Sequence, residues 1–64
     1  MNVIAEKRKL MGLSQKKLAG MVNVDRTAVS KWEIGESKPR ADILIKLAKI
    51  FGCSIDELLS EEKA

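Results

Sequence analysis

The stretch SQKKLAGMVNVDRTAVSKWE, residues 14–33, decides the fold that we expect for this chain. Its first half predicts a short helix, and Ser14 is a good N-cap because its hydroxyl can accept a backbone hydrogen bond. The apolar residues of that helix fall on one face at helical spacing: Leu18, Ala19 and Val22. Asn23 follows, and because Asn tolerates a positive φ it can end the helix and turn the chain sharply.

The second half of the stretch predicts another short helix, with two unlike faces. Asp25 is its expected N-cap. Val29 and Trp32 share one face, one turn apart, and we expect both in the core. The other face carries polar and basic side chains: Arg26, Thr27, Ser30 and Lys31. A short helix that is apolar beneath and basic or hydroxylic outside fits the width of the DNA major groove, so the stretch indicates DNA binding.

A longer pattern around this stretch carries a family resemblance. The pattern L-S-Q-x-x-L-A-x-x-V-x-V-D-R-x-x-V-S-x-W-E-x-G over residues 13–35 resembles the helix-turn-helix of the phage repressor and Cro class, the XRE-like family of transcriptional regulators. Further matching positions are Arg8, residues 11–13, Lys38-Pro39 and residues 43–59. The resemblance therefore covers nearly the whole chain.

This resemblance implies an all-α fold, a compact five-helix lambda-repressor-like DNA-binding domain. The domain would cover residues 1–60, with the helix-turn-helix motif at about residues 15–34 and a polar tail at residues 61–64. Outside the motif, helices are expected up to about residue 11, over about residues 41–51, and from residue 55 to about residue 60.

The ends of these outer helices have recognisable signals. Asn2 can cap the first helix, and Gly12 can end it in the left-handed conformation. Ser54 and Glu57 form an S-x-x-E capping box before the last helix. Arg40 stands where the family often has Ser or Thr, so the helix that follows it is expected to start poorly capped.

The resemblance also implies which side chains contact DNA. The expected base-contacting residues are Arg26, Thr27, Ala28 and Lys31. Arg26 opens the second helix of the motif, and an Arg can pair bidentately with O6 and N7 of guanine. The expected contacts to the DNA backbone are Gln15, Lys16, Ser30, Lys38 and Arg40. Arg40 could instead enter a narrow minor groove, and for all of these residues the alternative is an ordinary solvated surface.

Arg8 and Glu33 form an expected structural pair, because the family joins an Arg and a Glu at these positions. Such a pair ties the first helix to the third. The alternative is a solvated surface pair, which would contribute only about 0–1 kcal/mol to stability.

Composition excludes several classes of function. The 64 residues contain no His and one Cys, which removes the commonest general base and leaves no zinc or disulfide framework. We therefore expect no enzyme, no metal and no cofactor. Residues 1–40 carry nine Lys or Arg and four Asp or Glu, whereas residues 41–64 carry three and five. The basic half contains the motif, which suits a surface that faces phosphates.

Partners and location complete these expectations. One module of this size contacts few base pairs, so we expect a weak homodimer that binds an inverted-repeat operator of double-stranded DNA. We expect the protein to act as a repressor. The expected dimer interface consists of apolar residues that lie outside the core-facing sides of the last two expected helices: Ile45, Ile50, and Leu58 or Leu59. Scattered apolar surface residues are the alternative. No apolar run is long enough for a membrane span, so a cytoplasmic location is expected. An antitoxin-like module that binds another protein is the competing function.

Overall fold

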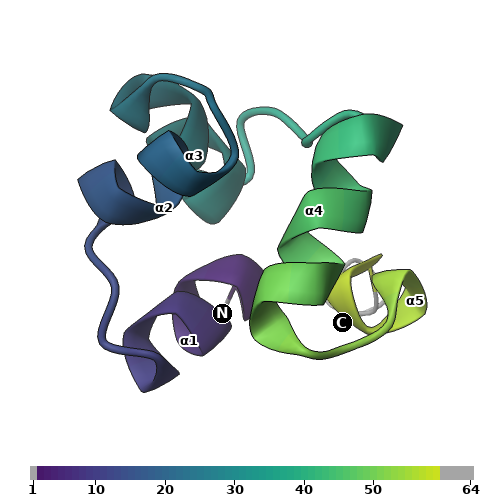
Figure 1. Cartoon of the computed structure of the whole chain (residues 1–64). Coiled ribbons are helices and arrows are strands. Elements are labelled where there is room, and N and C mark those ends of the chain that lie inside the picture. Colours follow the sequence, from purple (N-terminus) through teal and green to yellow (C-terminus); the bar gives the residue numbers. More distant parts are fainter. Residues whose placement is uncertain (1, 60–64) are drawn as a thin grey trace.

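The computed structural model describes residues 2–59, which form five helices and no strand (Figure 1). The helices are α1 (Val3–Leu10), α2 (Gln15–Met21), α3 (Arg26–Ile34), α4 (Ala41–Phe51) and α5 (Ile55–Leu59). The predicted all-α, five-helix fold is confirmed. The expected tail at residues 61–64, and Ser60 at the expected end of the last helix, lie outside the described residues.

Side-chain caps begin three of the helices as predicted. Asn2 Oδ1 accepts the backbone N–H of Ala5 at 3.1 Å. Ser14 Oγ accepts that of Lys17, and Ser54 Oγ accepts that of Glu57, both at 3.0 Å.

Asp25 is the N-cap of α3, as predicted, but its side chain makes no capping hydrogen bond. Asp25 has the extended backbone of an N-cap, and its backbone carbonyl accepts a hydrogen bond from the N–H of Ala28 at 3.0 Å. Arg40 also makes no side-chain cap, as expected for α4.

The turn between α2 and α3 depends on Asn23, whose φ is 61°. The backbone N–H of Val24 donates to the carbonyl of Ala19 at 2.9 Å, and that of Asn23 donates to Gly20 at 3.4 Å. These two bonds form the Schellman motif, which satisfies the last carbonyls of a helix and reverses the chain. Because the turn is so short, α3 begins directly against α2, and the predicted role of Asn23 is confirmed.

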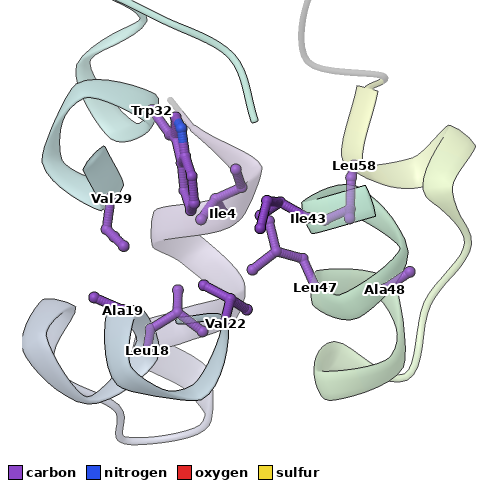
Figure 2. Packing of buried hydrophobic residues seen from close by; sticks show 10 residues of the cluster. All are labelled: Ile4, Leu18, Ala19, Val22, Val29, Trp32, Ile43, Leu47, Ala48 and Leu58. Atoms are coloured by element: carbon purple, nitrogen blue, oxygen red, sulfur yellow. The ribbon is translucent and has the colours of Figure 1, made fainter. Parts of the chain in front are cut away.

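The core lies where the five helices converge, and each of them contributes to it (Figure 2). Its buried members are Ile4, Leu18, Ala19, Val22, Val29, Trp32, Ile43, Leu47, Ala48 and Leu58. Leu18 and Val29 are fully buried, and the indole of Trp32 lies inside the cluster, as their spacing predicted. Burial of this α3 face leaves the opposite face of the same helix outward.

Several polar contacts fasten α1 to the rest of the fold, and two of them involve Asn2 and Lys7. Asn2 Nδ2 donates to the carbonyl of Trp32 at 2.7 Å, which joins the start of α1 to α3. Lys7 Nζ lies 2.6 Å from Glu57 Oε2 and joins α1 to α5. Within the described part of the chain, no helix combines the length and apolarity needed to cross a lipid bilayer.

Candidate nucleic-acid interface

The outward face of α3 carries the polar side chains that the sequence placed there. Arg26, Thr27 and Lys31 are exposed, and Ser30 is half-buried. Residues three and four apart share a helix face, so these four side chains form one surface opposite Val29 and Trp32. This surface, Arg26, Thr27, Ser30 and Lys31, is called the α3 outer face below.

Ala28 does not belong to the α3 outer face. It is half-buried and packs against the core, on the side that α3 turns toward the beginning of α4. The reason is the helical period, which places residue 28 one turn before Trp32 on the buried side. A contact between Ala28 and a base stays a prediction, with less of this side chain available than of Arg26, Thr27 or Lys31.

The expected pair of Arg8 and Glu33 is present and is largely buried. Arg8 Nε donates to Glu33 Oε2 at 2.6 Å, and Arg8 Nη2 donates to Glu33 Oε1 at 3.2 Å. The two side chains are only 11% and 9% exposed. Arg8 Nη1 also donates to the carbonyl of Leu13 at 2.7 Å. The alternative of a solvated surface pair does not fit this geometry.

The surroundings of Glu33 favour its ionised form. Burial alone would raise the pKa of this carboxyl, because it disfavours the charged state. Hydrogen bonds from Arg8 and Gln15, with the positive charges of Arg8 and Lys9, outweigh burial and hold the pKa of Glu33 below its ordinary value.

Gln15 connects this buried pair to the α3 outer face. Its Nε2 donates to Glu33 Oε1 at 2.9 Å, and its Oε1 accepts from Arg26 Nη1 at 3.2 Å. Sequence reasoning assigned Gln15 to the DNA backbone and missed these contacts. The available signal was the expected pair of Arg8 and Glu33. Arg8 also bonds to Leu13, and Gln15 lies only two residues further along the chain, at the start of α2.

The other basic candidates lie at the two ends of the motif. Lys16 is exposed in the first turn of α2, next to Gln15 and therefore near the start of α3. Lys38 and Arg40 are exposed in the segment between α3 and α4. Arg40 Nε lies 3.8 Å from Asp42 Oδ1, but both side chains are mostly solvent-exposed, so this pair is weak.

The four expected dimer residues do not form one surface. Leu58 is 3% exposed and belongs to the core, so the prediction that it lies in a dimer interface is wrong. Leu59 is the exposed leucine of the two, at 39%. Ile50 is half-buried against the core because it lies one turn from Leu47, whereas Ile45 is 46% exposed on α4. Leu59 borders a mainly apolar hollow of about 320 Å³, which is also lined by residues of α1, α3, α4 and the segment between α3 and α4.

Two short packed helices, a tight turn and a polar outer face on the second helix define a helix-turn-helix domain. The sequence matches the family model described as "Helix-turn-helix" over residues 4–58. The chain belongs to this helix-turn-helix family. Among residues 2–59, no three His, Cys, Asp or Glu side chains lie close enough together to hold a metal ion.

Several relatives of known name are similar to the chain. It is 47% identical over 51 residues to the HTH-type transcriptional activator BcrR of Enterococcus faecalis, covering 80% of this chain and 25% of that protein. It is 39% identical over 56 residues to repressor protein C2 of Salmonella phage P22, covering 88% of this chain and 26% of that protein. The chain thus spans about a quarter of the length of these two curated relatives.

A solved structure of the P22 c2 repressor, in complex with a synthetic operator, superposes with a TM-score of 0.82 at 38% sequence identity. The match covers 86% of this chain and 83% of that one.

Proposed function

We propose that this chain is a sequence-specific double-stranded DNA-binding transcriptional regulator that reads the major groove with α3. The observation that carries the proposal is the α3 outer face, which lies opposite the buried side of α3 in a fold similar to that of a repressor solved with a synthetic operator. A helix of this diameter fits the major groove, where base edges differ in their donors and acceptors.

The contacts divide by chemistry. Arg26 offers paired N–H donors for O6 and N7 of guanine, and Thr27 and Lys31 reach neighbouring base edges. Ser30, Lys16, Lys38 and Arg40 supply contacts to phosphates, which fix orientation without reading sequence.

Two copies act together in this proposal, on an inverted repeat with half-sites about 34–36 Å apart. A single module buries little surface on DNA, so one copy would bind weakly at physiological salt. Exposed Leu59 and the hollow beside it offer an apolar surface for the second copy. We propose that the protein acts as a repressor, because a protein that occupies a promoter is sufficient to block transcription from it. The proposed location is the cytoplasm.

Selection of duplexes from a random pool tests the proposal. The expected result is a recurring inverted repeat in the selected duplexes. At physiological salt the protein should bind this repeat at least a hundredfold more tightly than random duplex, since affinity for specific sites typically exceeds affinity for non-specific DNA by about 10³–10⁷. Sedimentation with the selected duplex should show two proteins per repeat. Equal binding to selected and random duplexes would instead favour an antitoxin-like module whose main partner is a protein.

A further inference from the structure

A continuous chain of hydrogen bonds runs from the interior of the domain to its outer surface. Arg8 is bonded to Glu33, Glu33 to Gln15, and Gln15 to Arg26. These four residues, called the polar relay below, come from α1, α2 and α3. Arg26 is the end that lies on the α3 outer face.

The chemistry of the relay fixes the orientation of the Gln15 amide. An ionised carboxylate can only accept hydrogen bonds, and a guanidinium can only donate them. Glu33 therefore requires the NH₂ of Gln15, at 2.9 Å, and Arg26 requires its carbonyl oxygen, at 3.2 Å. The reversed amide would place a donor against Arg26 and an acceptor against Glu33, so both bonds would be lost.

The inner end of the relay is rigid, whereas the outer end is not rigid by itself. Arg8 and Glu33 are 11% and 9% exposed and held by two hydrogen bonds to each other. Arg26 is an exposed Arg, and such a side chain has many rotamers to lose when it docks on a base edge. A bond to Nη1 restricts these rotamers and leaves the remaining N–H groups of the fork free to face a base.

We propose that Gln15 is a positioning residue for base recognition by Arg26, with Glu33 and Arg8 holding the Gln15 amide in the required orientation. This inference rests on the proposed function and goes beyond it, because it assigns part of the base specificity to residues that need not touch a base. If Gln15 served only as a phosphate contact, its loss would weaken binding equally on every sequence.

A double-mutant cycle in DNA binding separates these two roles. Gln15→Met, Arg26→Ala and the double variant are measured on the selected duplex and on duplexes with single base-pair changes. Gln15→Met should reduce discrimination at the base pair read by Arg26 by about tenfold, within the range known for coupled neighbours. The same substitution should leave discrimination unchanged in the Arg26→Ala background.

Two further variants complete the experiment. Lys16→Met removes a neighbouring charge and should weaken binding to all duplexes by one common factor. Glu33→Gln replaces an acceptor by a group that both donates and accepts, so discrimination at the same base pair should fall while circular dichroism reports an intact fold. Should Glu33→Gln unfold, the Gln15→Met cycle decides alone.

The inference is overturned if Gln15→Met weakens all duplexes equally, or if its effect on discrimination persists without Arg26. A wild-type protein that selects no recurring site would overturn the proposed function, and this inference with it. A recurring site together with a uniform effect of Gln15→Met would overturn the inference alone.

Discussion

The carboxylate of Glu33 accepts two hydrogen bonds from Arg8, one from Nε to Oε2 at 2.6 Å and one from Nη2 to Oε1 at 3.2 Å. This pair joins the third helix of the fold to the first. The pair lies at the edge of the core, with both side chains almost fully covered. It therefore supports the position of α3, whose outer face carries the proposed DNA contacts.

Breaking this pair should destabilise the domain strongly. Arg8→Met keeps much of the side-chain volume but leaves the Glu33 carboxylate covered without its main partner. We expect a loss of about 3 kcal/mol in the free energy of unfolding, the lower end of the range for a buried pair that loses one member. Urea unfolding followed by circular dichroism measures this, and a loss below about 1 kcal/mol would mean that the pair behaves like an exposed one.

The lowered pKa of Glu33 predicts a specific pH dependence of stability. Because the folded state depresses this pKa, the ionised carboxylate adds stability above the unfolded-state value of about 4.3 for Glu, and that stability is lost as the pH falls through the lowered pKa. The wild type should therefore lose stability more steeply than Glu33→Gln below about pH 4.3. Urea unfolding over a pH series compares them, and parallel curves for the two proteins would refute the prediction.

Asn23 and Gly20 provide a matched test of the α2 to α3 turn. Asn23 holds a φ of 61°, so Asn23→Ala should cost about 1 kcal/mol, whereas Asn23→Gly should cost nothing. Gly20 lies within α2, and an added Cβ there would meet no atom within 4 Å. Gly20→Ala should therefore stabilise the domain by about 0.5–1 kcal/mol. Thermal unfolding compares all three, and stabilisation by Asn23→Ala would contradict the role of the turn.

The phosphate contacts predict how salt affects binding. Removing one such contact, in Lys16→Ala or Lys38→Ala, should flatten the slope of log K against log salt by about 0.9. Lys49 is exposed in the last turn of α4, away from the α3 outer face, and Lys49→Ala serves as the control with an unchanged slope. Binding isotherms at several salt concentrations measure these slopes. Unchanged slopes in the Lys16 and Lys38 variants would remove those residues from the interface.

Features that depend on neighbours in the chain could be predicted from the sequence. Ser14, Asn23 and Gly12 act through backbone groups a few residues away, and the helical period places Leu18 and Trp32 in the core. The family resemblance supplied the pair of Arg8 and Glu33.

Features that depend on how helices are oriented toward one another were not predictable in the same way. Whether Leu58 or Leu59 of α5 is buried depends on how that short helix docks on α4. The contacts of Lys7 with Glu57, and of Gln15 with Arg26, join residues far apart in the chain. Local pattern carries no information on such distances. The two hydrogen bonds of Gln15 in the polar relay were therefore found only in the structure, whereas its Arg8 and Glu33 pair was expected.

If α3 reads base edges in the major groove, Arg26 contacts a guanine in each half-site. The most direct test replaces each guanine of the selected site in turn by 7-deazaguanine, which lacks the N7 acceptor in the major groove. At one position in each half-site the wild type should lose about 1–3 kcal/mol of binding free energy, whereas Arg26→Ala should lose nothing further there. If every replacement is neutral, or if Arg26→Ala loses as much as the wild type, the account of recognition by α3 is contradicted.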